Sequence, residues 1–373
     1  MRQTNTLIVG ASISGLACAA CLQASGIAYI LIEKENCIAA PWRNHYERLH
    51  LHTNKALSNL PYKKFDKAIP RYPSRLQVIE YLEQYQQTFN INPVFNIEAN
   101  KIKRENDYWI TETPDETFQS KNIIIATGPF SLPKQIDFTG IETFPGKLLH
   151  SAEYTTGKIF KGQKVLVVGF GNSACEIAID LFEQGAFPSM SVRSAVNIVP
   201  RDVAGIPILA LSLLMKSLPP SVADKLNAPL LRLLVGDITK LGLKKLPYGP
   251  LEQIQKEAKA PVLDIGTIDL IKKGKIKIYD DIDHIDHSKV IFKNGKSEVF
   301  DVIVAGIGYD RNCEDLLEID KQRFEDLKLP TNKQRYFGKD GLYFCGFYIS
   351  PTGQIREIGI DAKRIAASIK AQA

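Results

Sequence analysis

Two glycine-rich segments have the residue types and the spacing that can bind the diphosphate of a dinucleotide. Each lies between an apolar run and a helix-like segment, and they are 159 residues apart, from Gly10 to Gly169. In such turns glycine permits a tight bend, and the diphosphate lies over the free N–H groups of a helix N-terminus. One match of this kind is weak evidence. Two matches in one chain predict two bound dinucleotides, typically a flavin and a nicotinamide nucleotide.

The first turn is suited to FAD. Gly10 permits the bend, and Gly15 lets the helix pack against the strand. Ser12 stands where a glycine normally allows the closest backbone approach, but serine is small and we expect binding to survive. Glu33 ends the next apolar run 23 residues after Gly10, where a carboxylate accepts hydrogen bonds from a ribose hydroxyl. A purely structural turn without a nucleotide is the alternative.

The second turn is suited to NADPH. Gly169 and Gly171 occupy the glycine positions, and Ala174 is the third small residue. The following strand ends without an acid, and Arg193 stands 24 residues after Gly169, where a 2′-phosphate needs a cation. The guanidinium fork matches phosphate geometry better than a lysine does. The pattern therefore favours NADPH over NADH.

The sequence around each turn predicts a strand–turn–helix–strand unit that would position the turn. One such unit fills the first 35 residues, and a second runs from 164 to 193. A buried strand is predicted at 121–128, ending in Gly128, and a similar run follows at 302–309. We therefore predict an α/β fold with two Rossmann-like dinucleotide-binding domains, the NADPH domain inserted into the FAD domain. The expected boundaries are 1–155 for the first part of the FAD domain, 156–299 for the NADPH domain and 300–373 for the second part of the FAD domain.

Several further elements follow from local patterns. A helix is predicted over 75–89, and a C-terminal helix over 359–370. Short strands are predicted near 276–279 and 290–292, with Asn294-Gly295 as a hairpin signal.

Composition excludes several classes of protein. The chain has 373 residues, 45% of them apolar and 24% charged, and its formal charge of +6 is spread along the sequence. We therefore expect no nucleic-acid partner. The most apolar stretch, 205–214, is too short to cross a membrane, which needs roughly 20 apolar residues. It can be a core helix, an interface or the lining of a substrate channel. We expect a cytoplasmic protein without stable membrane insertion and without a metal site.

Cys18 and Cys21 form a C-x-x-C pattern, which can signal a redox pair. They lie in the helix after the first glycine turn, among small alanines that let this helix pack closely on a sheet. Packing is the favoured interpretation, and a redox role is the alternative.

Between the two turns, Phe144, Gly146, His150 and Tyr154 fit the pattern F-x-G-x-x-x-H-x-x-x-[Y/F]. This is the fingerprint of the class B flavin-containing monooxygenases, and the chain resembles that family over nearly its whole length. The resemblance is closest to the YUCCA-type indole-3-pyruvate monooxygenases and their bacterial relatives. Tyr154 stands where Baeyer–Villiger monooxygenases typically carry Trp. Other matching stretches lie at 37–42, 46–52, 72–75, 171–173, 192–194, 261–267 and 341–347.

The resemblance implies an NADPH-dependent FAD monooxygenase. In this family NADPH reduces FAD, and the reduced flavin forms a C4a-hydroperoxide with O2. One oxygen atom then passes to a nitrogen, a sulfur or a 2-oxo acid carbonyl of a small organic substrate. The C-terminal stretch 350–354 does not resemble the plant ending, so the substrate stays open.

The resemblance also implies site residues. His52 and Asn54 are the catalytic candidates; His52 stands where many animal and bacterial members carry an Asn near the flavin. Packing or loop hydrogen bonding is the alternative role for His52. The further cofactor-binding candidates are Trp42, Arg43, Gly128 and Gly346 on the flavin side, and Asn172 and Ser173 on the nicotinamide side.

Other functions use similar sequence features. An NADPH oxidase or flavin reductase would use the same cofactors but release H2O2 without oxygenating a substrate. A disulfide reductase would need an exposed cysteine pair facing the flavin, and Cys18 and Cys21 are poorly placed for that. A redox-sensing or binding protein without activity is the remaining alternative.

Overall fold

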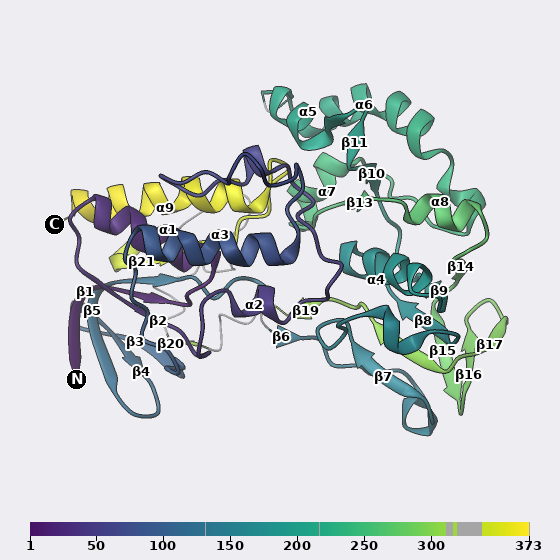
Figure 1. Ribbon diagram of the computed structural model, residues 1–373, viewed down its shortest axis with the longest axis horizontal. Coiled ribbons are helices and arrows are strands. Elements are labelled where there is room, and N and C mark those ends of the chain that lie inside the picture. The colour runs from purple at the N-terminus through teal and green to yellow at the C-terminus, as the bar shows by residue number, and fades with distance from the viewer. Residues whose placement is uncertain (131, 216, 311–315, 319–337, 373) are drawn as a thin grey trace. The chain divides into compact units, whose positions relative to one another are not determined.

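The computed structural model describes residues 1–130, 132–215, 217–310, 316–318 and 338–372, and the chain forms two compact units (Figure 1). Unit 1 comprises Met1–Arg43, Thr53–Leu132 and Asp310–Ala373. Unit 2 comprises Asn44–His52 and Pro133–Tyr309. The short segment 44–52 therefore belongs to unit 2, although the chain on either side of it belongs to unit 1.

Within the residues that the structure describes, unit 1 is built on a seven-stranded sheet in the order β2-β1-β5-β4-β3-β20, with β21 paired to β5. The pairs β1–β2, β1–β5 and β5–β21 are parallel, whereas β3–β4 and β4–β5 are antiparallel. The parallel strands β1 and β5 end in buried apolar runs, at 7–9 and 123–125, as expected where both faces of a sheet are covered. The strands are β1 (Arg2–Val9), β2 (Tyr29–Ile32), β3 (Lys101–Glu105), β4 (Tyr108–Glu112), β5 (Thr117–Ile125), β20 (Leu317–Glu318) and β21 (Leu342–Phe344).

Three long helices of unit 1, α1 (Ile13–Ala24), α3 (Arg75–Thr88) and α9 (Gln354–Ala371), run alongside one another over this sheet (Figure 1). The predicted helix over 75–89 is confirmed, and it begins with a capping box between Ser74 and Gln77. The C-terminal helix begins at Gln354 rather than Gly359, since the positive φ of Gly353 (+101°) marks its start.

Cys18 and Cys21 are 1% exposed in α1, as the packing interpretation expects. Burial raises the pKa of the Cys21 thiol to about 12. A thiol held protonated in this way is a poor nucleophile.

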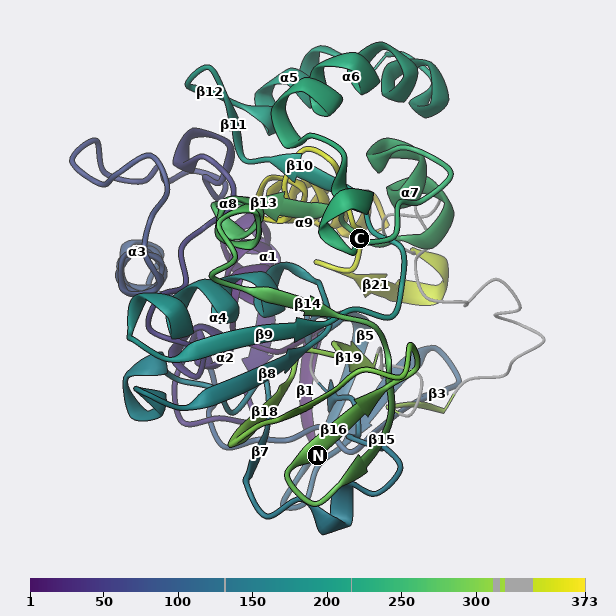
Figure 2. The ribbon, with the colours of Figure 1, turned by 90° about the vertical axis from the view of Figure 1, so that its right-hand side faces the viewer.

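Unit 2 is built on an all-parallel sheet in the order β14-β9-β8-β18-β7 (Figure 2). Its strands alternate between two cores, with Val165 and Val167 in one and Leu166 and Val168 in the other. The strands are β7 (Lys147–His150), β8 (Lys164–Val168), β9 (Phe187–Ser191), β14 (Lys277–Tyr279) and β18 (Val302–Ala305).

The long helix of this unit after the second glycine turn is α4 (Asn172–Glu183). The predicted hairpin at Asn294-Gly295 is confirmed and joins β16 (Lys289–Phe292) to β17 (Ser297–Val299). The other helices of unit 2 are α5 (Ile208–Leu214), α6 (Pro220–Val235), α7 (Pro250–Glu257), α8 (Thr267–Lys272), η2 (Ile141–Thr143), η3 (Gly157–Phe160) and η4 (Ile238–Leu241). Its other strands are β10 (Ile198–Pro200), β11 (Asp202–Val203), β12 (Ile206–Pro207), β13 (Val262–Asp264) and β15 (Ile282–Asp286).

The remaining short elements are α2 (Ala40–Arg43), η1 (Lys55–Leu57), β6 (Leu132–Pro133), β19 (Tyr309–Asp310) and η5 (Lys339–Gly341). Strands β6 and β19 pair with each other. No helix in the described ranges combines the length and the apolar character that crossing a membrane requires.

The α/β class with two dinucleotide-binding folds agrees with the prediction, but the units divide elsewhere than expected. Strand β18 lies in the sheet of unit 2, between β8 and β7, and not in a resumed first domain. Strand β7, expected in the first part of the FAD domain, also belongs to unit 2. A short buried apolar run fits any parallel sheet, so its sequence does not show which sheet it joins. Within the expected segment 300–373, residues 311–315, 319–337 and 373 lie outside the described residues.

Candidate functional site

The first glycine turn requires glycine at two positions. Gly10 has a φ of +103°, and a Cβ there would lie 2.9 Å from the carbonyl oxygen of Ala126, which follows β5. A Cβ on Gly15 would lie 1.8 Å from the carbonyl oxygen of Gly10. The main chain of the turn therefore packs closely against its own helix and against the end of the neighbouring strand.

The N-terminus of α1 is suited to an anion. Ser12 is the N-cap residue, yet its side chain makes no capping hydrogen bond, and the first turn holds no acidic residue. The first N–H groups of a helix have no partner within the helix, and the helix dipole is positive there. These features fit a bound diphosphate.

Glu33 lies where the sequence predicts a ribose-binding carboxylate, directly after β2. It is 8% exposed. Its Oε2 accepts a hydrogen bond from the Ala11 N–H at 2.6 Å, and its Oε1 accepts one from the Glu35 N–H at 3.1 Å. A carboxylate has about four acceptor sites, so capacity remains for a ribose hydroxyl.

Gly128 and Gly346 lie at the same edge of the unit 1 sheet as the first turn. Gly128 follows β5 and has a φ of +78°, with open space where a Cβ would be. Gly346 follows β21, and a Cβ there would lie 2.3 Å from Ser14 Oγ in the first turn of α1. This is the carboxyl edge of parallel strands, where open α/β sheets bind their ligands.

Trp42 and Arg43 form the end of the short helix α2, and Trp42 is half-buried. The segment before them contacts the glycine turn, since the Ala39 N–H donates to the carbonyl oxygen of Ala11 at 3.3 Å. Arg43 pairs with Glu83 of α3 at 2.5 Å and donates to the carbonyl oxygen of Ile38 at 3.1 Å. Its guanidinium is therefore already engaged within unit 1.

The second glycine turn resembles the first, except that the N-cap of the following helix is a glycine, Gly171, where the first turn has Ser12. Gly169 has a φ of +111°, and a Cβ there would lie 2.4 Å from the carbonyl oxygen of Gly306. Gly171 is the N-cap of α4, and no atom lies within 4 Å of its would-be Cβ. Helix α4 likewise has no side-chain cap and no acidic residue in its first turn. Space and unpaired N–H groups at this end again fit a diphosphate.

The Asn172 side chain binds the main chain of the segment around β13. Its Oδ1 accepts from the Leu263 N–H at 2.8 Å, and its Nδ2 donates to the carbonyl oxygen of Pro261 at 3.4 Å. The neighbouring Ser173 interacts with the Tyr46 side chain. The side chains of both predicted nicotinamide-side residues thus have protein partners.

Arg193 is exposed and follows β9 by two residues, as the sequence predicts. Two lysines near it are neutralised: Lys244 pairs with Asp280 at 2.9 Å and Lys293 with Asp281 at 2.7 Å. Arg193 has no ion pair with any residue in the described ranges. It is thus a cation left available at the end of this strand.

His150 of the fingerprint is a structural residue at the end of β7. It is 4% exposed, and its Nδ1 accepts from the Ala152 N–H at 3.1 Å. The ring must then donate from Nε2, which lies 3.1 Å from the carbonyl oxygen of Gly308. Burial lowers the pKa of the His150 imidazole. The fingerprint histidine therefore joins β7 to the segment after β18.

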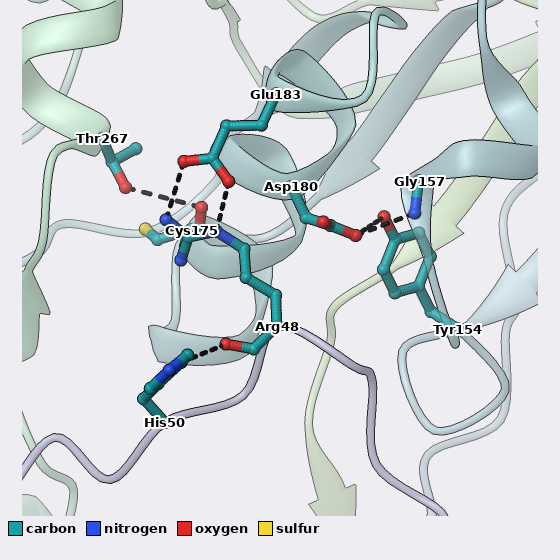
Figure 3. Close-up of polar contacts among 8 residues, drawn as sticks. All are labelled: Arg48, His50, Tyr154, Gly157, Cys175, Asp180, Glu183 and Thr267. Carbon is teal, nitrogen blue, oxygen red and sulfur yellow. Dashed lines mark hydrogen bonds and ion pairs between the residues drawn. The ribbon is translucent and has the colours of Figure 1, made fainter. Parts of the chain in front are cut away.

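Residues 44–52, which we name the strap, bind one face of α4. Arg48 forms a two-pronged ion pair with Glu183, with N–O distances of 2.8 and 2.9 Å (Figure 3). One turn earlier on the helix, Asp180 accepts from the Tyr154 hydroxyl at 2.6 Å and from the Gly157 N–H at 2.8 Å (Figure 3).

His52, at the end of the strap, contacts the same helix. Its Nε2 bonds Oε1 of Glu176, which is 1% exposed. The other carboxylate oxygen, Oε2, is buried and has no hydrogen-bond partner in the described residues. Asn54 lies in unit 1 and caps η1, accepting from the Ala56 N–H at 2.9 Å.

Three acids of α4 are not among the site residues predicted from the sequence: Glu176, Asp180 and Glu183. A sequence pattern could have identified them, because these acids stand at i, i+4 and i+7 in a helix whose other residues are mostly apolar or small. Buried acids require partners, which makes such a pattern informative.

In the described ranges, no group of three or more potential metal ligands lies together.

The comparisons with known proteins agree with this geometry. Residues 7–202 match the family model described as pyridine nucleotide-disulphide oxidoreductase. The probable indole-3-pyruvate monooxygenase YUCCA3 of Arabidopsis thaliana is 40% identical over 91% of this chain and 81% of its own length. The indole-3-pyruvate monooxygenase YUCCA6 of the same plant is 39% identical over 98% of this chain and 90% of its own. The chain belongs to the class B flavin-containing monooxygenases.

As a member of this family, the chain is a flavin-dependent monooxygenase that uses a flavin, a nicotinamide cofactor, O2 and a small-molecule substrate. The predicted family and enzyme class are confirmed.

Solved structures show the same fold at low identity. The flavin-containing monooxygenase from Stenotrophomonas maltophilia has a TM-score of 0.72 and 18% identity, covering 98% of this chain and 99% of that one. Cyclohexanone monooxygenase from Rhodococcus sp. Phi1, bound to NADP+, has a TM-score of 0.76 and 16% identity, covering 99% and 84%. The bacillithiol disulfide reductase of Staphylococcus aureus has a TM-score of 0.70 and 17% identity, covering 100% and 99%.

Proposed function

We propose that unit 1 binds FAD and unit 2 binds NADPH, so that the NADPH-binding domain is inserted into the FAD-binding domain. In unit 1, Gly10, Ser12 and Gly15 would hold the diphosphate of FAD, and Glu33 its ribose. The support is the uncapped N-terminus of α1 beside a buried carboxylate that keeps acceptor capacity. In unit 2, the turn at Gly169 and Gly171 would hold the diphosphate of NADPH, with Ser173 and Asn172 beside it.

The preference for NADPH over NADH rests on Arg193. Its neighbours Lys244 and Lys293 are paired with aspartates, whereas Arg193 has no ion pair with a described residue. A 2′-phosphate offers the planar guanidinium a two-pronged, charge-assisted contact. NADH lacks that phosphate and would leave the arginine unengaged.

For the substrate we propose an aromatic 2-oxo acid such as indole-3-pyruvate. The observation that carries this proposal is that the two relatives described above, at 40% and 39% identity, are both named as indole-3-pyruvate monooxygenases. When bound, FAD would take a hydride from NADPH and activate O2. Transfer of one oxygen to the C2 carbonyl carbon breaks the C1–C2 bond, so the carboxylate leaves as CO2. The product is the carboxylic acid with one carbon fewer, and the second oxygen atom ends in water.

The protein would bind, orient and shield the reactants. We propose that His52 and Asn54 are the polar residues that hydrogen-bond at the reacting oxygen. Trp42, Gly128 and Gly346 would border the flavin.

The test is turnover under ¹⁸O2 with FAD, NADPH and indole-3-pyruvate, with an amine and a thioether as parallel substrates. We expect one ¹⁸O atom in the shortened acid and about one product per NADPH consumed. Label in the amine or thioether product alone would replace the 2-oxo acid with that substrate class. Peroxide equal to NADPH consumed, with every substrate and without labelled product, would instead show an NADPH oxidase.

A further inference from the structure

We propose that Glu176 is the positioning residue of the active site: it holds the His52 imidazole so that Nδ1, and not Nε2, faces the reactants. The inference rests on the proposed catalytic role of His52. It assigns a function to a buried acid of α4 that the glycine turn and the fingerprint do not include.

With Glu176 ionised, the contact itself fixes the tautomer of the His52 ring. A carboxylate accepts hydrogen bonds and does not donate them, so the His52 Nε2 bonded to Glu176 Oε1 must carry a proton. In the neutral ring Nδ1 is then an acceptor, and in the charged ring it is a second donor. Nδ1 has no hydrogen-bond partner in the described part of the chain, and the His52 side chain is 16% exposed. Nδ1 is therefore the ring nitrogen left for a substrate or a reacting oxygen.

The carboxylate is well placed to hold the ring in one orientation. Glu176 is almost completely buried, and its Oε2 has no partner among the described residues. A buried carboxylate without its partner is costly, so Glu176 strongly favours the orientation of His52 that keeps this bond. Acid partners orient histidine rings in the same way at metal sites, where their loss typically reduces activity about 10- to 100-fold.

The strap fixes the main chain that carries His52. Tyr46 is buried and interacts with Ser173, and Arg48 pairs with Glu183. Ser173, Glu176 and Glu183 lie at i, i+3 and i+10 along α4, spacings that place them on one face of the helix. The helix that begins at the second glycine turn thus anchors the backbone of the strap at two points and its histidine at a third.

Asp180 provides a matched control on the same helix. It is a buried acid one turn after Glu176, but its partners are Tyr154 and Gly157, which lie outside the strap. Replacing it removes a buried charge from α4 without touching the bond to His52.

The experiment compares Glu176→Gln and Glu176→Leu with Asp180→Asn. Side-chain ¹⁵N NMR, with the His52 signals assigned by a His52→Asn variant, reports which ring nitrogen is protonated. We expect protonated Nε2 in the wild type and in Asp180→Asn, and a mixture of tautomers in both Glu176 variants. Retained Nε2 protonation in Glu176→Leu would overturn the proposal.

Activity supplies the second measurement. We expect kcat/KM for oxygenation to fall about 10- to 100-fold in the Glu176 variants, with more of the NADPH ending as H2O2. Anaerobic reduction of the bound flavin by NADPH should change less than twofold. In a His52→Asn background, Glu176→Gln should cause little further loss, because its effect passes through the ring. A full additional loss there, or unchanged oxygenation in both Glu176 variants, would refute the proposal.

The two failures can be told apart. If the wild type oxygenates none of the substrates, the proposed function fails, yet the NMR measurement still tests whether Glu176 sets the tautomer. If the wild type oxygenates and the Glu176 variants do so equally well, only the positioning role fails.

Discussion

The Glu33 carboxylate, at the end of β2, accepts a hydrogen bond of 2.6 Å from the Ala11 N–H inside the first glycine turn. One residue thereby joins two parts of the expected FAD site that lie 22 residues apart in the chain. The same carboxylate both fixes the turn and keeps acceptor sites for a ribose.

Glu33→Gln should weaken FAD binding about tenfold, the factor that corresponds to about 1.4 kcal/mol, a usual value for a charge-assisted hydrogen bond. The amide keeps the size of the side chain but loses its charge and half of its acceptor capacity. The measurement is the dissociation constant for FAD from flavin fluorescence. Glu35→Gln is the control, since Glu35 contributes its main-chain N–H and not its side chain. Equal FAD affinity in the wild type and Glu33→Gln would contradict the ribose-binding role.

Arg193→Ala should raise the KM for NADPH at least about tenfold and change that for NADH less than about twofold, because the arginine would contact only the 2′-phosphate. Steady-state NADPH and NADH consumption gives both values. Lys244→Ala is the matched control, as Lys244 is already paired with Asp280. Equal changes for the two nucleotides would refute phosphate recognition by Arg193.

The two glycine turns can be tested by alanine at contrasting positions. Gly15→Ala should destabilise the protein by about 1–3 kcal/mol or more, since its Cβ would lie 1.8 Å from a main-chain oxygen. Gly171→Ala meets no atom within 4 Å and should change the free energy of unfolding by no more than about 0.5 kcal/mol.

Gly171→Ala should nevertheless weaken NADPH binding, because its methyl group takes up space at the N-terminus of α4. Urea unfolding and nucleotide titration separate the two effects. Wild-type NADPH affinity in Gly171→Ala would argue against a diphosphate at this turn.

His150 predicts an acid-sensitive fold. Burial lowers the pKa of its imidazole in the folded protein, whereas in the unfolded chain it is about 6.5. The unfolded state therefore binds the proton more readily, and the stability that neutral His150 contributes is complete above pH 6.5. This contribution is lost as the pH falls below 6.5 toward the lowered pKa of the folded state.

Thermal melts from pH 7.5 to 5 should show a steeper loss of stability in the wild type than in His150→Gln, which has no titrating ring. His284→Gln is the control, because 45% of the His284 side chain is exposed. Parallel pH curves for the wild type and His150→Gln would show that His150 does not contribute to the acid sensitivity.

The sequence by itself determined the features that depend on a few neighbouring residues. Both glycine turns, Glu33 and Arg193 at the ends of the following strands, and the hairpin at Asn294-Gly295 lie where local spacing predicts them. A strand–turn–helix unit brings its own residues together, so its geometry can be inferred from the positions of glycines, apolar residues and charges.

Tertiary structure alone decided which distant segments meet. It placed β7 and β18 in the sheet of unit 2. The sequence of a buried apolar strand does not indicate which sheet the strand joins, so only the folded structure could decide this. It engaged Arg43 with Glu83, and it brought His52 to Glu176 across 124 residues of sequence. A buried acid must find a partner, but only the folded path of the strap over α4 determines that the partner is His52.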